Sequence, residues 1–86
     1  FMILNIYILI SSKRGVKMKK RLNLIGYRKM ADYTQSELAE KINISYSNYN
    51  SKENGKTEFT YSECLKIRDI LMQRLGKTLT IDELFA

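Results

Sequence analysis

The sequence predicts a single small domain of the all-α class, built from five helices. Apolar residues recur at spacings of three and four from about residue 20 onward, which is typical of amphipathic helices. The chain has 86 residues, enough for one domain, and contains no proline that would interrupt a helix. A helix-start signature, in which an apolar residue precedes Thr, two further residues, Glu and a second apolar residue, occurs three times. We therefore expect residues 18–86 to fold as one helical domain.

The first helix is expected from about Lys20 to Ala31. It has no capping signature at its start, so only the spacing of its apolar residues indicates it. Gly26 lies within this helix and costs about 1 kcal/mol relative to alanine. The residues expected on its inner face are Leu24, Tyr27, Arg28 and Ala31.

The second helix is expected from Gln35 to Ile42, after a capping box formed by Thr34 and Glu37. A third helix should run from Tyr46 to Asn54 after the capping hydroxyl of Ser45. This third helix has no acidic residue near its start. Its positive dipole end is therefore free to attract phosphate.

Two residues are expected in the left-handed conformation around the third helix. Asn43 occupies the tight turn before it, where asparagine is the usual substitute for glycine, and Gly55 ends it. The spacing indicates that the two helices pack on one another as a unit. The inward-facing residues of this unit are Leu38, Ala39, Ile42, Ile44, Tyr49 and Glu53.

The fourth helix should extend from Tyr61 to about Leu75, with Thr60 at its start and Gly76 at its end. A last short turn follows at residues 81–85, again after a capping box. The C-terminal segment is more apolar than a tail of its size requires. Its apolar residues either close the core of the single chain or form a dimer surface, and they are Leu79, Ile81, Leu84 and Phe85.

The chain lacks the residues on which most enzyme and metal sites depend. It contains no histidine, a single cysteine and no glycine-rich phosphate-binding loop. Cys64 falls in the apolar pattern of the fourth helix and is expected to be a buried core residue in a reducing cytoplasm. We expect no enzymatic activity, no metal, no cofactor and no small-molecule effector.

The first seventeen residues differ in character from the rest. FMILNIYILI is almost wholly apolar, but it is too short to span a membrane as a helix and lacks the basic segment that precedes a signal peptide core. Codons for Lys13, Arg14 and Gly15 can resemble a ribosome-binding site, with Met18 as the start. We therefore expect residues 1–17 to be translated upstream sequence, and the net charge then falls to +3. A genuine leader would instead be a candidate for strand pairing.

The outward face of the third helix carries polar, uncharged side chains where lysine and glutamate are more usual. Such a face is either simply solvated or a surface for DNA base edges. Asparagine can bond adenine N6 and N7, serine can bond several bases, and a tyrosine ring can lie against a thymine methyl. Because no arginine is present for guanine, we expect these contacts to favour A·T pairs. The expected base-contacting residues are Tyr46, Ser47, Asn50 and Ser51.

Positive charge is concentrated near the N-terminus. The net charge is +6, yet residues 1–30 carry +8 and no acid, which leaves −2 for the remainder. An excess of this size favours nucleic acid or an anionic membrane as partner. A run of like charges is commonly a solvated arm, but beside a DNA-binding helix such an arm often contacts phosphate. On this ground we expect phosphate contacts from Lys19, Lys20 and Arg21.

These features together resemble the helix-turn-helix domain of Cro and cI-type phage repressors and their bacterial relatives, the XRE family. The resemblance covers Leu24 to Phe85 and implies a five-helix, lambda-repressor-like fold that binds double-stranded DNA. The string from Tyr49 to Lys56 is similar to that of small phage and prophage proteins of unknown function. The sequence departs from the wider family at Lys52, where an apolar residue is usual. The matching residues are Arg28, Thr34, Gln35, Glu37, Leu38, Ala39, Glu53, Asn54, Gly55, Lys56 and Phe59.

The resemblance also implies roles for particular residues. It implies an ion pair between Arg28 and Glu53 that ties the first helix to the end of the third. It further implies phosphate contacts from Gln35, at the start of the second helix, and from Asn54 and Lys56, just after the third.

We expect the chain to be a sequence-specific transcriptional regulator, a phage or prophage repressor or Cro-like protein that inserts residues 46–54 into the major groove. It would act as a homodimer on a palindromic operator with half-sites about 34 Å apart, on the nucleoid of a bacterial cytoplasm. One alternative is an antitoxin or protein-interaction adaptor built on the same scaffold. Another is a membrane-active protein that depends on the apolar leader.

Overall fold

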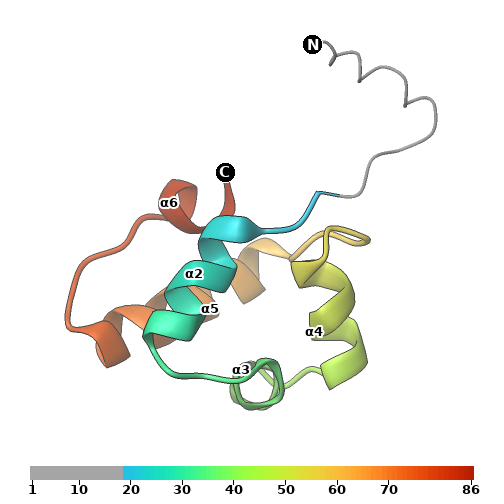
Figure 1. The fold of residues 1–86 in the computed structure, drawn as a ribbon, viewed down its shortest axis with the longest axis horizontal. Coiled ribbons are helices and arrows are strands. Elements are labelled where there is room, and N and C mark those ends of the chain that lie inside the picture. Colours follow the sequence, from blue (N-terminus) through green and yellow to red (C-terminus); the bar gives the residue numbers. More distant parts are fainter. Residues whose placement is uncertain (1–18) are drawn as a thin grey trace, which may run out of the picture.

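The computed structural model describes residues 19–86. The expectations for residues 1–17, including an upstream leader and a start at Met18, lie outside the described residues. The described part contains five helices and no strand, which confirms the all-α fold class. Figure 1 shows α2 crossing in front of α5, with α3 and α4 at one end and α6 at the other. The helices are α2 (Leu22–Met30), α3 (Gln35–Lys41), α4 (Tyr46–Glu53), α5 (Tyr61–Leu75) and α6 (Ile81–Phe85).

Three of the helices begin with the expected reciprocal cap. At the start of α3, the Thr34 hydroxyl accepts from the Glu37 N–H at 3.0 Å, and the Glu37 carboxylate accepts from the Thr34 N–H at 2.8 Å. The same pair of bonds begins α5 at Thr60 and α6 at Thr80. Helix α4 begins at Ser45 with the single side-chain bond that its sequence predicts.

The turns use left-handed residues where they were expected and at one further place. Asn43 has φ 65°, Gly55 has φ 85° and Gly76 has φ 67°. Asp32, between α2 and α3, also has a positive φ of 62°, which the sequence pattern did not indicate. Aspartate tolerates this conformation better than most residues because its short side chain can bond locally.

Helix α2 is shorter than expected: it begins at Leu22 rather than Lys20 and ends at Met30 rather than Ala31. Arg21 precedes it with φ −83° and ψ 74° and makes no side-chain cap. The Arg21 N–H instead donates to the Glu53 carbonyl at 2.9 Å, at the end of α4. This tertiary bond holds Arg21 outside the helix and fixes where the N-terminal segment meets α4.

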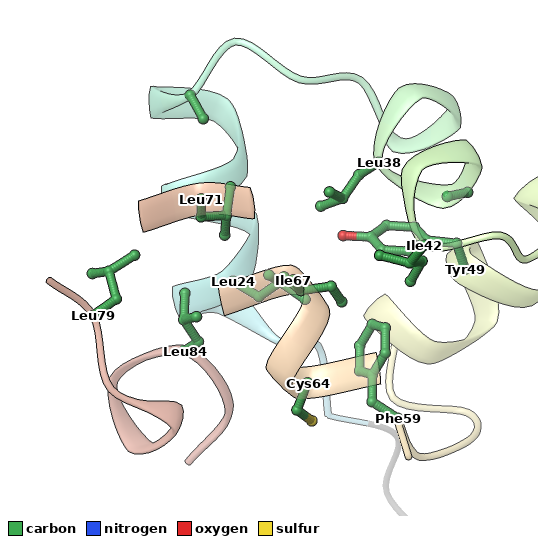
Figure 2. Packing of buried hydrophobic residues seen from close by; sticks show 12 residues of the cluster. Leu24, Leu38, Ile42, Tyr49, Phe59, Cys64, Ile67, Leu71, Leu79 and Leu84 are labelled. Atoms are coloured by element: carbon green, nitrogen blue, oxygen red, sulfur yellow. The ribbon is translucent and has the colours of Figure 1, made fainter. Parts of the chain in front are cut away.

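The core lies between all five helices. Helix α5 contributes Ile67 and Leu71, both fully buried, and Leu24 of α2 and Leu38 of α3 pack with them (Figure 2). The centroid of the Phe59 ring lies 5.7 Å from that of Tyr49 and 5.4 Å from that of Phe85, and both ring pairs have edge-to-face geometry. This aromatic row joins α4 to the C-terminal helix.

The C-terminal segment closes the core of the single chain. Leu79 and Leu84 are buried, and Ile81 and Phe85 are partly buried against the same cluster. Of the two roles that the sequence allowed for these residues, the structure therefore uses the core role. No helix in the described part of the chain is long and apolar enough to cross a membrane.

Cys64 is a buried free thiol on α5. Its burial raises the pKa of the thiol above the ordinary value. Such a thiol is largely protonated and unreactive at neutral pH. Over residues 19–86, no group of three or more histidine, cysteine or acidic side chains is arranged to hold a metal ion.

Candidate nucleic-acid interface

Helices α3 and α4 pack against each other. Leu38, Ala39 and Ile42 of this pair are buried, and Ala39 lets the helices approach closely. In the turn between them, the Ile44 N–H donates to the Ala39 carbonyl at 3.0 Å. Together with the left-handed Asn43, this bond sets the angle at which α4 leaves α3.

The two faces of α4 differ sharply in exposure. Tyr49 and Glu53 on the inner face are 0% and 1% exposed, whereas Tyr46 on the outer face is 53% exposed. Ser47 is also exposed, and the remaining expected base-contacting residues, Asn50 and Ser51, are half-buried. The first turn of α4 carries no acidic residue. The outer face is thus accessible and uncharged, and its helix dipole is unopposed at the N-terminal end.

The carboxylate of Glu53 is buried on the inner side of α4. Glu53 accepts from Arg28 Nε at 2.9 Å and Nη2 at 3.1 Å, so the structure brings together the two residues of the expected ion pair. The Tyr49 hydroxyl and Gln35 Nε2 each donate to the same carboxylate at 2.6 Å. Arg28 Nη1 also donates to the Tyr33 carbonyl at 2.9 Å. With four donors, the Glu53 carboxylate has its acceptor capacity filled.

The pKa values of two members of this cluster are shifted. Burial by itself would lower the pKa of Arg28, but the hydrogen bond and negative charge of Glu53 raise it above the ordinary value. Burial raises the pKa of Tyr49, and its hydrogen bond to Glu53 raises it further. Arg28 is therefore charged and Tyr49 protonated at neutral pH, which keeps the cluster in one hydrogen-bonding state.

Three side-chain amides extend the cluster outward along α4. Gln35 Oε1 accepts from Asn50 Nδ2 at 3.1 Å, and Asn50 Oδ1 accepts from Asn54 Nδ2 at 3.1 Å. Asn50 therefore uses one of its two amide hydrogens and one of the two lone pairs of Oδ1 within the protein. In the sequence, the four-residue spacing between Asn50 and Asn54 was the only sign of these hydrogen-bonded amides, and it is a weak one.

The corner after α4 brings basic residues from two segments together. A Cβ added at Gly55 would lie 2.7 Å from the carbonyl carbon and 2.8 Å from the nitrogen of Lys19, so glycine is required for this approach. Lys19, Lys20 and Lys56 are exposed. The Lys56 N–H donates to the Ser51 carbonyl at 2.9 Å, which anchors the corner to α4.

We expected Arg21 to contact phosphate, but in the structure its side chain is bound to two acceptors within the protein. Its guanidinium donates from Nη1 to the Phe85 carbonyl at 3.0 Å and from Nη2 to the Glu58 carboxylate. The Arg21 side chain is 22% exposed. Arg21 thus ties the start of α2 to the C-terminal helix, and its charge is already paired.

Lys52 keeps its place on the half-buried side of α4 by pairing with α5. Its Nζ lies 2.6 Å from Glu63 Oε1, with side-chain exposures of 15% and 14%, and 6.0 Å from the centroid of the Phe59 ring. Burial would raise the pKa of Glu63, but the bonds from Lys52 and from the Thr60 N–H lower it. The ion pair therefore lets a lysine occupy this half-buried position.

The paired helices, the exposed uncharged face of α4 and the basic corner define a DNA-binding domain of the helix-turn-helix class. A family model described as helix-turn-helix matches residues 24–71. The chain belongs to this family of Cro and cI-type (XRE) DNA-binding regulators. No curated protein and no solved structure gives a significant match to the chain.

Proposed function

We propose that this regulator recognises a specific operator by inserting the outer face of α4 into the major groove, as a repressor or Cro-like protein of a phage or prophage. The observation that carries the proposal is the contrast between the two faces of α4. The buried Tyr49 and Glu53 fix the helix, and the opposite side is uncharged and exposed at Tyr46 and Ser47. A helix held in this way presents its outer side chains without the entropic cost of ordering them on binding.

The contacts divide into two kinds. Base edges are contacted from α4 by Tyr46, Ser47, Asn50 and Ser51, since these side chains share its outer face. Phosphates are contacted by residues on both sides of that face, which fix its position in the groove. The phosphate-contacting residues are Gln35, Asn54, Lys56, Lys19 and Lys20.

The proposed operator is a palindrome bound by a homodimer in the cytoplasm of a bacterial host. One copy of α4 spans only a few base pairs, which is too little sequence for useful specificity. Two copies related by a twofold axis contact half-sites about 34 Å apart. The symmetry of the operator then mirrors the symmetry of the dimer.

Selection of bound duplexes from a random DNA library, with the full 86-residue chain, tests this function. We expect enrichment of one inverted repeat whose half-site centres are about 10 base pairs apart. Sedimentation of the complex with the enriched duplex should give two chains per duplex. Binding that enriches no sequence would contradict the proposal, and enrichment of a single half-site with one chain bound would contradict the homodimer.

A further inference from the structure

Helix α2 carries two large apolar side chains that the fold leaves open to solvent. Leu22 is 71% exposed and Met30 is 64% exposed. They are eight residues apart with Gly26 midway between them, so all three lie on one side of the helix. Figure 1 shows α2 at the front of the molecule, with no other helix of residues 19–86 over it. We call these three residues the α2 face.

Gly26 is not explained by the fold of the single chain. It lies in the middle of α2, where glycine is less favourable than alanine. A Cβ added at Gly26 would meet no atom within 4 Å, so no neighbour among the described residues requires a glycine there. A glycine midway between two exposed apolar side chains does, however, allow a second helix to approach α2 closely.

We propose that the α2 face binds the α2 face of a second copy of this chain, with the two helices antiparallel about a twofold axis at Gly26. Leu22 of each copy then lies against Met30 of the other, because each is four residues from the axis on opposite sides. A surface hollow of about 500 Å³ lies beside Leu22 and is also lined by Leu84 and Ala86. The flexible side chain of Met30 from the second copy is suited to fill it.

The charges at the two ends of α2 fit the antiparallel arrangement. Lys19 and Lys20 precede the helix and Asp32 follows it, and all three are exposed. Antiparallel packing brings the lysines of each copy to the end of the other α2 that carries Asp32 and the negative pole of the helix dipole. Lys29 then lies opposite the uncharged Asn23. A parallel pair would instead set like charges against each other. This self-complementarity favours a second copy over an unrelated partner.

This contact deepens the proposed function because it names a surface through which two copies meet. The C-terminal segment, the other candidate for a dimer surface, closes the core of the single chain. The inference rests on the proposed function only for its consequence on DNA, since pairing is a property of the free chain. The α2 face includes none of the proposed base-contacting residues of α4.

Sedimentation velocity of the full 86-residue chain over a concentration series, without DNA, tests the pairing. We expect a reversible equilibrium between monomer and dimer for the wild type. Gly26→Glu should weaken dimerisation by on the order of tenfold or more, because two bulky like charges then meet at the axis. The same change should raise the urea midpoint of the monomer, because glutamate is a better helix former than glycine and no neighbour obstructs it. Loss of pairing is then separate from unfolding.

Ser62→Glu is the matched control for this experiment. It adds the same charge at an exposed position of α5 and should leave dimerisation unchanged. A wild type that stays monomeric up to about 1 mM, where even a weak contact pairs, would overturn the inference. A dimer that Gly26→Glu leaves intact, or that Ser62→Glu weakens equally, would overturn it as well. Each of these results leaves the operator selection, and with it the proposed function, to be decided separately.

Disulfide formation tests the antiparallel orientation. Gly26→Cys lies at the axis, so two copies should join under mild oxidation with oxidised glutathione. Met30→Cys should not join to itself but should join to Leu22→Cys in an equimolar mixture. The native Cys64 is buried and present in every variant, so it does not distinguish them. Met30→Cys joining to itself as fast as Gly26→Cys would contradict the proposed orientation.

Discussion

The inner and outer faces of α4 contain similar side chains but differ in burial and in hydrogen bonding. Tyr49 and Tyr46 lie three residues apart on the same helix, and one is 0% exposed while the other is 53% exposed. The Tyr49 hydroxyl is bound to Glu53 at 2.6 Å, whereas Tyr46 is open to solvent. The outer face, which we propose for DNA binding, therefore differs from the inner face in its unfilled hydrogen-bonding capacity and not in residue type.

The hydrogen-bonded amides of Gln35, Asn50 and Asn54 are intermediate between these two tyrosines in how much of their hydrogen-bonding capacity is filled. Asn50 belongs to the outer face by position but has part of its capacity filled by Gln35 and Asn54. Interactions behind the surface therefore influence what the surface can offer to DNA. The predictions below separate the two faces, beginning with the substitution expected to have the largest effect.

Replacing Glu53 with alanine should have the largest effect on folding. The change leaves the buried Arg28 guanidinium without its partner and should lower the free energy of unfolding by about 3–5 kcal/mol. Glu58→Ala is the control because Glu58 also pairs with an arginine but has a side chain that is 84% exposed. That change should cost no more than about 1 kcal/mol. Urea unfolding followed by circular dichroism measures both, and equal losses would contradict a special role for the inner face.

The two tyrosines allow a finer comparison of the faces. Tyr49→Phe removes one of the four donors to the buried Glu53 carboxylate and should cost about 1–3 kcal/mol. Tyr46→Phe removes a hydroxyl from the exposed face and should change stability by less than about 0.5 kcal/mol. The same urea unfolding experiment measures both variants, and a Tyr46→Phe loss as large as that of Tyr49→Phe would be inconsistent with the structure.

The same pair of variants predicts a difference in alkali. The pKa of Tyr49 is raised in the folded chain, so the native state holds this proton more tightly than the unfolded chain does. The resulting stabilisation is complete below about pH 10, the ordinary pKa of tyrosine, and is lost as the pH rises above it. The free energy of unfolding should therefore fall less steeply with pH in Tyr49→Phe than in Tyr46→Phe. Parallel slopes above pH 10 would argue against the buried hydroxyl.

The Lys52–Glu63 pair should contribute less to stability at neutral pH than Glu53 or Tyr49, but its contribution should be visible in acid. The pKa of Glu63 is lowered in the folded chain, so its contribution is present above the ordinary value of 4.5 and is lost as the pH falls through the folded value. Lys52→Met should change stability at pH 7 by no more than about 1 kcal/mol and make its decline in acid shallower. Lys66→Met, at an exposed position of α5, should leave the acid dependence as in the wild type. Thermal unfolding between pH 3 and pH 7 compares the two variants.

Local signals in the sequence predicted much of the fold. The three capping boxes, the helix ends at Gly55 and Gly76 and the left-handed Asn43 each depend on a few neighbouring residues, and the structure contains all of them. The start of α2 was misplaced because it depends on a bond from the Arg21 N–H to the distant Glu53 carbonyl. Asp32 adopts a left-handed conformation that aspartate allows but does not signal.

The candidate site was less predictable because its contacts join separate helices. The spacing placed Tyr46 outside and Glu53 inside, but it could not show that Gln35 and Asn50 meet across the turn between α3 and α4. The charge pattern likewise assigned Arg21 to phosphate, since it could not show the nearby Phe85 carbonyl and Glu58 carboxylate. Periodicity shows on which face of a helix a residue lies. The orientation of a side-chain amide depends instead on its hydrogen-bond partners, which come from other helices.

The most direct test of the division between the faces of α4 compares Tyr46→Ala with Lys56→Ala on the selected operator and on a scrambled duplex over a series of salt concentrations. Tyr46→Ala should weaken operator binding by on the order of tenfold, leave binding to the scrambled duplex unchanged and keep the wild-type salt slope. Lys56→Ala should weaken binding to both duplexes by a similar factor and reduce the salt slope by about one. Equal weakening of both duplexes by Tyr46→Ala would contradict the assignment of the outer face of α4 to base recognition.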